Sequence, residues 1–242
     1  MRVIILAAGR GSRLKSLTEK KPKSLIKINK KTILQHQLDI YKKCGINKIA
    51  IVTGYKKNLF DKFEIKKFNN KNWNKTNMVY SLIKAKHWLK NYNCIVSYSD
   101  ILIGKETIQD LIKAKYKLTL PYNLNWKKNW KLRYSKPLSD LETFRINKNQ
   151  DIIDIGNQAK TFKEIQGQFM GLLKFTPHAW NRVNFFLNKQ NEKKENMQMT
   201  QLVQKIIKKK ILKVKGIPIK DQWFEVDNFN DYLVAKKHYK EL

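Results

Sequence analysis

A glycine-rich segment followed by two cations is the part of this sequence best suited to chemistry. Gly9 and Gly11 end an apolar run, and Arg13 and Lys23 come shortly after them. Glycine permits positive φ angles and close backbone approach, so the N–H groups of such a loop can bind the phosphates of a nucleotide. Fixed cations stabilise the charge that spreads over the oxygens during phosphoryl transfer. The pattern therefore predicts a phosphate-binding loop with Arg13 and Lys23 as catalytic cations.

The same glycines do not form a dinucleotide-binding fingerprint. Arg13 stands where the third glycine of that motif would lie. Asn29, Lys30 and Lys31 stand where an acidic residue would bind the ribose. The spacing therefore argues against a nicotinamide-dependent dehydrogenase.

Two acidic residues beside apolar segments, Asp100 and Asp227, could hold a divalent cation. Asp100 follows an apolar strand expected at residues 94–98, which places it at the carboxyl edge of a parallel sheet, where such folds bind ligands. Glu225 and Asp227 alternate with Val226, so a strand would turn both carboxylates to one face. Carboxylate oxygens are ligands that Mg²⁺ prefers, with phosphates and water completing its coordination. We expect Asp100 and Asp227 to bind Mg²⁺ as a cofactor.

Alternating strand-like and helix-like segments position these residues. Residues 1–8 form a nearly continuous apolar run that ends at the glycines, as in a buried parallel strand. The following pattern predicts helices at 32–44, 78–90 and 107–115, and strands at 48–53 and 94–98. Such alternation predicts an α/β fold with a Rossmann-like, mostly parallel sheet flanked by helices.

The second half of the chain has a different pattern. Residues 118–175 contain short β-like runs at 141–146 and 152–155 between polar turns, which indicates a small antiparallel insertion. The remainder predicts helices at 177–189 and 199–209, a solvated loop at 189–195, a strand at 211–219, an extended segment at 223–227 and a last helix from Asp231. We expect one domain, residues 1–242, with a nucleotide-binding half at 1–117 and an acceptor-binding half at 118–242.

A net charge of +32, almost all of it from lysine, is the most unusual property of the composition. Basic residues attract polyanions, so a nucleic-acid-binding protein is the non-enzyme alternative. Base recognition favours the bidentate guanidinium, however, and arginine occurs only at positions 2, 10, 13, 133, 145 and 182. No helix-turn-helix, zinc finger or RNA-binding signature is recognisable. We therefore interpret the charge as solvated lysines and expect no specific nucleic acid partner.

The remaining bulk properties suit a cytoplasmic protein. Cys44 and Cys94 are far apart, without the spacing of a zinc site or the density of a disulfide scaffold. The longest early apolar run is shorter than a signal-peptide core, and no stretch approaches a membrane span. The histidines are interpreted as ordinary surface or core residues.

The segment from Leu6 to Leu14, with Thr18 and Pro22-Lys23 after it, resembles the opening signature of the sugar-phosphate pyrophosphorylase type of nucleotidyltransferase, L-A-A-G-x-G-x-R-L, then T, then P-K. The resemblance implies a glycosyltransferase-A-like nucleotidyltransferase fold. It also implies that Lys23 contacts the acceptor phosphate or the reacting centre. The nucleotide-binding set implied at this end of the chain is Leu6, Ala7, Ala8, Gly9, Arg10, Gly11, Ser12, Arg13 and Asp100.

Later segments are similar to the bacterial choline-phosphate cytidylyltransferase branch of that superfamily. They are Thr53-Gly54-Tyr55, Asn77 with Ser81, and the segment at 223–227. The resemblance implies Mg²⁺-dependent transfer of CMP from CTP to a small phosphorylated or phosphonate acceptor, with release of pyrophosphate. It implies a role in decorating cell-surface polysaccharide or lipid. It adds Thr53, Gly54, Tyr55, Asn77 and Ser81 to the nucleotide-binding set.

The acceptor stays open at this stage. Gln168 and Gln198 stand where relatives often carry Glu and Asp, and these losses of charge argue mildly against phosphocholine. Aminoethylphosphonate, a phosphorylated amino acid or polyol, and a sugar 1-phosphate remain alternatives. The nearest rival activity is a sugar 1-phosphate nucleotidyltransferase that uses UTP or dTTP, and the oligomeric state, with a homodimer as one option, is also open. The expected acceptor-binding set is Lys23, Gln168, Trp180, Gln198, Trp223 and Glu225.

Overall fold

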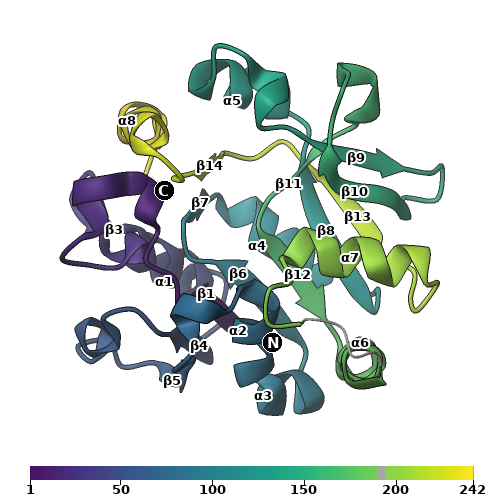
Figure 1. Ribbon diagram of the computed structural model, residues 1–242, viewed down its shortest axis with the longest axis horizontal. Coiled ribbons are helices and arrows are strands. Elements are labelled where there is room, and N and C mark those ends of the chain that lie inside the picture. Colours follow the sequence, from purple (N-terminus) through teal and green to yellow (C-terminus); the bar gives the residue numbers. More distant parts are fainter. Residues whose placement is uncertain (190–193, 242) are drawn as a thin grey trace.

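The computed structural model describes residues 1–189 and 194–241, and a mixed β-sheet forms its centre (Figure 1). The strand order is β11-β8-β12-β6-β1-β4-β5, and β13 pairs with β8. The bounds are β11 (Gln168–Phe169), β8 (Leu118–Asn123), β12 (Leu172–Phe175), β6 (Cys94–Tyr98), β1 (Arg2–Ala7), β4 (Ile49–Thr53), β5 (Lys66–Asn69) and β13 (Lys215–Ile219).

The first half of the chain builds the parallel part of this sheet. β1 lies between β4 and β6 and is parallel to both, and β5 continues the parallel run beyond β4. Leu6 is in register with Val52 on one side and Tyr98 on the other. The carboxyl ends of these strands therefore meet at one edge of the sheet, as the alternation of elements predicted.

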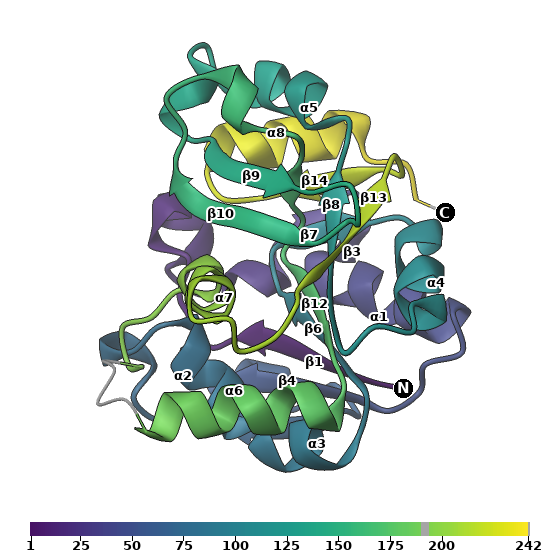
Figure 2. The same cartoon turned by 90° about the vertical axis from the view of Figure 1, so that its right-hand side faces the viewer.

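Helices cover both faces of the sheet because successive residues of a buried strand point to opposite sides. Val3 and Ile5 of β1 pack in one apolar cluster with α1 and α4, whereas Ile4 and Leu6 pack in another with α2, α3 and α6. Figure 2 shows α3 and α6 together, away from α1 and α4. The bounds are α1 (Ile33–Lys43), α2 (Met78–Lys84), α3 (Lys86–Asn91), α4 (Lys105–Lys113), α6 (Pro177–Lys189) and α7 (Met199–Lys208).

Most predicted elements are present, and several of them differ in detail from the prediction. The helix predicted at 78–90 is divided at Ala85, which ends α2 and begins α3. The strand predicted at 211–219 begins only at Lys215, after a turn that follows α7. The loop predicted at 189–195 includes residues 190–193, which lie outside the described residues.

The antiparallel insertion contains the predicted hairpin and also a helix that the sequence pattern did not predict. β9 (Glu142–Ile146) pairs with β10 (Ile152–Gln158), and α7 packs on β10. The helix is α5 (Trp126–Arg133), in which Trp126 and Trp130 lie one turn apart and are both buried. Most residues of α5 are polar, so the sequence did not show the apolar periodicity from which a helix is predicted.

The C-terminal segment returns to the centre of the fold. β14 (Trp223–Glu225) pairs antiparallel with β7 (Ile101–Ile103), which directly follows Asp100. α8 (Phe229–His238) begins two residues before the predicted start because the Asn228 side chain accepts a hydrogen bond from Asp231 N–H and caps the helix. No helix in the described residues is long and apolar enough to cross a membrane.

The remaining elements are short. A two-stranded ribbon of β2 (Lys27–Ile28) and β3 (Lys31–Thr32) precedes α1. The 3-10 helices are η1 (Ser12–Thr18), η2 (Lys23–Leu25), η3 (Lys57–Phe60), η4 (Trp73–Lys75), η5 (Pro137–Ser139) and η6 (Phe162–Glu164).

Candidate active site

The glycine-rich loop leaves β1 at the carboxyl edge of the sheet and is held by hydrogen bonds. Tyr55 N–H donates to the carbonyl of Ala8 at 2.8 Å, and Thr18 Oγ1 donates to the carbonyl of Gly11 at 3.1 Å. Gly11 has a φ of 76°, a left-handed conformation that favours glycine. A Cβ atom on Gly11 would lie 2.8 Å from the Cβ atom of Lys23. The loop therefore needs glycine at this position for its turn and for its contact with Lys23.

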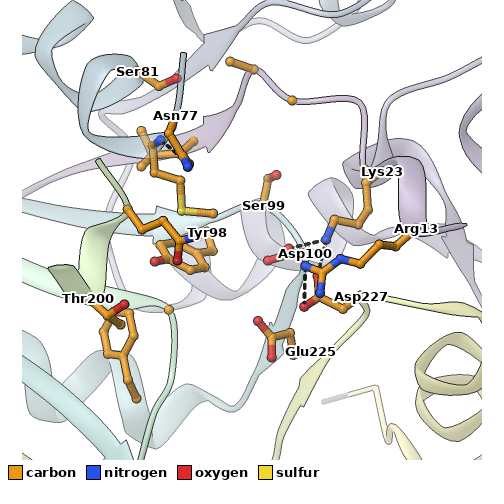
Figure 3. A pocket seen from close by; sticks show the side chains of 18 of the residues that line it. Arg13, Lys23, Asn77, Ser81, Tyr98, Ser99, Asp100, Thr200, Glu225 and Asp227 are labelled. Carbon is orange, nitrogen blue, oxygen red and sulfur yellow. Dashed lines mark hydrogen bonds and ion pairs between the residues drawn. The ribbon is translucent and has the colours of Figure 1, made fainter. Parts of the chain in front are cut away.

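Lys23 lies at the centre of a charged group drawn from distant parts of the chain. Its Nζ atom lies 2.5 Å from Oδ2 of Asp100 and 2.6 Å from Oδ1 of Asp227. Nη2 of Arg13 lies 3.0 Å from Oδ2 of Asp227. Figure 3 shows these four side chains together on one side of the pocket. The fold thus brings the predicted catalytic cations to the predicted metal ligands.

The charges of this group stabilise one another against the cost of burial. Burial opposes the charged form of Lys23, yet Asp100 and Asp227 raise its pKa above the ordinary value. Burial likewise opposes the charged form of Asp227, but Lys23 and Arg13 hold the pKa of that carboxyl below its usual range. Lys23 and Asp227 are therefore a charged pair throughout the neutral pH range.

Glu225 completes a cluster of three carboxylates that suits a metal ion. Ligand oxygens of Asp100, Glu225 and Asp227 all lie within 4.8 Å of one another. Oδ1 of Asp100 is buried and has no hydrogen-bond partner among the described residues. Burial, followed by the charge of Asp227, raises the pKa of Glu225 to about 8. The oxygen donors and the unpartnered Asp100 atom fit a hard divalent cation such as Mg²⁺.

Arg133, which was not predicted as a site residue, contacts Glu225 of this cluster and the neighbouring Asp231. Its Nε and Nη2 atoms donate to the two carboxylate oxygens of Asp231 at 2.8 and 3.1 Å. The same Nη2 lies 3.4 Å from Oε2 of Glu225. The Asp231 side chain is fully buried, and its Oδ2 also accepts the backbone N–H of Asp227 at 3.0 Å. Arg133 therefore fixes both β14 and the start of α8.

A cavity of about 570 Å³ extends from this charged group across the carboxyl edge of the sheet. One side is formed by the first half of the chain and the other by the insertion and the C-terminal segment. The lining residues that the sequence predicted as nucleotide-binding, acceptor-binding or metal-binding are Leu6, Ala8, Gly9, Gly11, Arg13, Lys23, Asn77, Ser81, Asp100, Gln168, Gln198, Glu225 and Asp227.

Asn77 and Ser81 lie at the start of α2, across the pocket from Lys23 (Figure 3). The Asn77 side chain accepts the backbone N–H of Met78 at 2.8 Å and so caps the helix. Ser81 Oγ accepts a hydrogen bond from Asn70 Nδ2 at 3.0 Å. Both side chains are thus fixed in position while still facing the cavity.

Six residues of the predicted nucleotide-binding set do not line this cavity. Thr53 is buried at the end of β4, and Gly54 lies against Trp73, where a Cβ atom would come within 2.5 Å of the indole side chain. The Tyr55 hydroxyl donates to the carbonyl of Glu19 at 2.5 Å. The six are Ala7, Arg10, Ser12, Thr53, Gly54 and Tyr55.

Two tryptophans that were predicted to bind the acceptor lie in the core, so the prediction that they line the acceptor site was wrong. Trp180 on α6 is completely buried and packs edge-on against Phe175, with ring centroids 6.0 Å apart. Trp223 on β14 is 3% exposed and stacks on Trp130 at 5.6 Å. Aromatic residues supply so much apolar area that core positions compete for them, and the sequence alone did not show which role each one takes.

The cavity also contains residues that the sequence analysis did not assign. Glu142 is the first residue of β9, and Asp140 directly follows η5, so no sequence pattern showed that both would line the cavity. The other unassigned lining residues are Trp73, Thr76, Met78, Tyr98, Ser99, Trp130, Phe169, Gly171 and Thr200.

Fold and site together define a nucleotidyltransferase, and the chain belongs to the family of the MobA-like NTP transferase domain, whose model matches residues 3–135. The similarity to nucleotidyltransferases inferred from the glycine-rich segment is thereby confirmed.

Individual relatives narrow the comparison. The chain is 36% identical over 248 residues to a CTP:phosphoglutamine cytidylyltransferase from Campylobacter jejuni, covering 96% of this chain and 97% of that protein. It is 35% identical over 120 residues to a choline-phosphate cytidylyltransferase from Streptococcus pneumoniae, covering 48% and 52% of the two chains. A solved CTP:phosphocholine cytidylyltransferase from Streptococcus pneumoniae has a similar fold, with a TM-score of 0.76, 23% identity and coverage of 98% and 97%.

Proposed function

We propose that this protein transfers CMP from CTP to a small phosphorylated acceptor and releases pyrophosphate. The observation that carries the proposal is the group of Lys23, Arg13, Asp100 and Asp227 beside the glycine-rich loop. CTP as the nucleotide rests on the full-length similarity to a cytidylyltransferase. We assign the nucleotide to the wall formed by residues 1–117 and the acceptor to the wall formed by residues 118–242, as two halves of one domain.

The reaction is a single in-line displacement. An oxygen of the acceptor phosphate forms a bond to the α-phosphorus of CTP, while the bond from that phosphorus to the bridging oxygen breaks and pyrophosphate leaves. The attacking oxygen is already ionised at neutral pH, so no general base is required. Arg13 and Lys23 stabilise the charge on the phosphate oxygens, and the glycine-rich loop orients the triphosphate through its N–H groups.

Asp100 and Asp227 are the residues that would hold Mg²⁺, with Glu225 beside them. When bound, Mg²⁺ supplies positive charge to the triphosphate and to the departing pyrophosphate. Lys23 pairs with both aspartates, so its ammonium offsets the repulsion between the two carboxylates. To contact a phosphate oxygen of the substrate, the Lys23 side chain must give up at least one of its contacts with the two aspartates.

A phosphorylated amino acid amide is the first acceptor to test, because phosphoglutamine is the substrate named for the relative that matches the whole chain. Gln168 and Gln198 both line the cavity, and their side chains are neutral, so the cavity wall carries no charge at these two positions. The UTP-dependent and dTTP-dependent sugar 1-phosphate alternative rests on shorter matches, such as 44% identity over 59 residues to a glucose-1-phosphate uridylyltransferase from Haloferax volcanii.

The test is pyrophosphate release by the purified protein with Mg²⁺. Each of CTP, UTP, dTTP, ATP and GTP is paired with phosphoglutamine, phosphocholine, aminoethylphosphonate, glycerol phosphate and hexose 1-phosphates. Release with CTP and a non-sugar acceptor is expected. Release only with UTP or dTTP and a hexose 1-phosphate would assign the chain to the sibling activity instead. Replacing Mg²⁺ with EDTA should abolish release in either case.

We further propose that the protein works in the cytoplasm, where its nucleotide and Mg²⁺ are available, and that its product serves the decoration of cell-surface polysaccharide or lipid. Loss of a CMP-linked metabolite from cells that lack the protein would support this role. A homodimer stays a prediction, and light scattering on the purified protein would test it.

A further inference from the structure

Two acidic residues that line the cavity, Asp140 and Glu142, do not belong to the charged group around Lys23. Thr200 Oγ1 donates to Oε1 of Glu142 at 3.5 Å, and Gln168 Nε2 donates to the backbone carbonyl of Glu142 at 2.6 Å. Figure 3 shows Thr200 across the pocket from Lys23. Glu142 is therefore held on the opposite side of the cavity from the cations that bind phosphate.

The charges of the cavity are unevenly balanced. Three of its acidic residues lie within 3.4 Å of a lysine or arginine. Asp140 instead accepts a hydrogen bond from Trp130 Nε1 at 3.1 Å, and the Glu142 carboxylate has, among the described residues, only the 3.5 Å contact with Thr200. Within residues 1–189 and 194–241, no ion pair joins Asp140 or Glu142 to a basic side chain.

This imbalance is unexpected in a chain with 51 lysines and arginines. A buried carboxylate without a cationic partner is destabilising, and a lysine could easily have provided one. Burial, followed by the charge of Asp140, raises the pKa of Glu142 above its ordinary value. The fold therefore keeps a carboxylate facing the cavity at a cost to its own stability, which a cation from outside would offset.

We propose that Glu142 binds a primary ammonium group of the acceptor, with Asp140 adding negative charge behind it. The acceptor is then a zwitterion whose phosphate lies toward Arg13 and Lys23 and whose ammonium lies toward Thr200. This inference rests on the proposed function, and it specifies the substrate class of the same cavity.

The cavity suits an N–H-bearing ammonium better than a quaternary one. A quaternary ammonium has no N–H donor and needs free aromatic faces around it. Trp130 is only 4% exposed, packs against Trp223 with ring centroids 5.6 Å apart and has the Arg133 guanidinium 4.6 Å from its ring centroid, so little of its ring is free. Tyr98 packs edge-on to Phe169 at 5.7 Å. The oxygen atoms of Glu142 and Thr200, by contrast, can accept N–H donors directly.

The test compares Glu142→Gln with the wild type on two acceptors that differ only in the ammonium group. The probes are phosphoglutamine and its N-α-acetyl derivative, each with CTP and Mg²⁺. For phosphoglutamine, kcat/KM of the variant should fall by about 10- to 100-fold, mainly through KM, because a charged hydrogen bond is lost. For the acetylated probe the variant should match the wild type within about threefold. Glu142→Asp should recover part of the loss.

Glu64→Gln is the matched control, because it makes the same chemical change at an exposed residue that does not line the cavity. It should leave both acceptors unaffected. Thermal unfolding of Glu142→Gln checks that the fold is retained, which is expected since glutamine has nearly the same shape as glutamate.

Equal losses of kcat/KM on the two probes would overturn the proposal, and so would a wild type that prefers the acetylated probe or a hexose 1-phosphate. Calorimetric binding of both probes gives an answer that does not need turnover. The wild type should bind phosphoglutamine more tightly than the acetylated probe, and Glu142→Gln should remove that difference. An unchanged difference in the variant, or none in the wild type, contradicts the proposal, whereas silence of every nucleotide and acceptor pair in the turnover assay contradicts only the proposed function.

Discussion

One ammonium group holds two carboxylates in the centre of this site. Lys23 Nζ lies between Asp100 and Asp227, whose side chains come from segments that follow different strands. Without that cation, the carboxylates of Asp100, Glu225 and Asp227 would repel one another within 4.8 Å. The same ammonium is the proposed ligand of the reacting phosphate, so one residue has both a structural and a catalytic role in the proposal.

Replacing either Lys23 or Asp100 should strongly reduce catalysis while the protein stays folded. Lys23→Ala and Asp100→Asn are each expected to lower kcat by about a hundredfold or more, because each deletes a charge that stabilises the transition state. Steady-state pyrophosphate release at saturating Mg²⁺ measures the effect. Lys30→Ala, at an exposed position, is the control. Turnover near the wild-type value in either site variant would exclude that residue from the mechanism.

A comparison of two glycines with the same backbone conformation can distinguish the effect of backbone strain on stability from the effect of a steric contact with Lys23 on activity. Gly11 has a φ of 76° and Gly45 a φ of 77°, but only Gly11 is close to Lys23. Alanine at either position should cost about 1–2 kcal/mol of unfolding free energy through its left-handed conformation. Gly11→Ala should also lower kcat at least about tenfold, because its Cβ atom displaces Lys23, whereas Gly45→Ala should keep full activity. Urea unfolding and turnover assays distinguish the two effects, and equal activity in both variants would contradict the argument.

At this scale the sequence singled out residues in a continuous motif or at the end of an apolar segment, including Asp100 and Asp227, and missed Arg133 and Glu142. Gly9, Gly11 and Arg13 are neighbours in the chain, so their shared role was visible. Arg133 and Glu142 were not visible, because their partners lie far away in the sequence. No local pattern distinguishes such residues from exposed ones of the same type.

At the scale of the elements, β14 connects the C-terminal segment to the middle of the chain. It pairs with β7, and the backbone N–H of Val226 donates to the carbonyl of Asp100 at 2.9 Å. That contact places Asp227 beside Asp100. The sequence predicted an extended segment at 223–227 and the direction of its acidic side chains. It did not predict the partner strand, because Ile101–Ile103 is too short to show a pattern.

Helix α4 offers a test of how one element is terminated. Nζ of Lys174 on β12 donates to the carbonyls of Leu111, Ile112 and Ala114 at 2.8, 3.1 and 2.5 Å. Lys174→Met should lower the unfolding free energy by about 2–3 kcal/mol, because the last carbonyls of the helix lose a charged donor. Urea unfolding measures the loss, and kcat of the folded variant should be unchanged.

The control for this prediction is Lys113→Met, since Lys113 is an exposed lysine in the last turn of the same helix. Its effect on the unfolding free energy should stay within about 0.5 kcal/mol. Similar small losses in both variants would show that the contacts of Lys174 contribute little to stability.

The whole molecule carries a net charge of +32, while its cavity concentrates acidic residues. Repulsion among surface lysines destabilises the compact state, and salt screens it. Raising NaCl from about 50 mM to about 500 mM should therefore raise Tm, by about 2–4 °C for each kcal/mol of repulsion removed. Sucrose of equal osmolality is the control in scanning calorimetry. A Tm that stays constant or falls in NaCl would mean that the lysines do not repel one another appreciably.

The pairing of Lys23 with Asp227 joins residues that are 204 positions apart in the chain. At a synthesis rate of about 5–20 residues per second, roughly 10–40 s pass between the two on the ribosome. During that interval the phosphate loop and Asp100 exist without β14, and Lys23 lacks half of its final partners. We therefore expect that the growing chain cannot act on CTP until Asp227 is made, and that a product of premature termination before Asp227 is inactive.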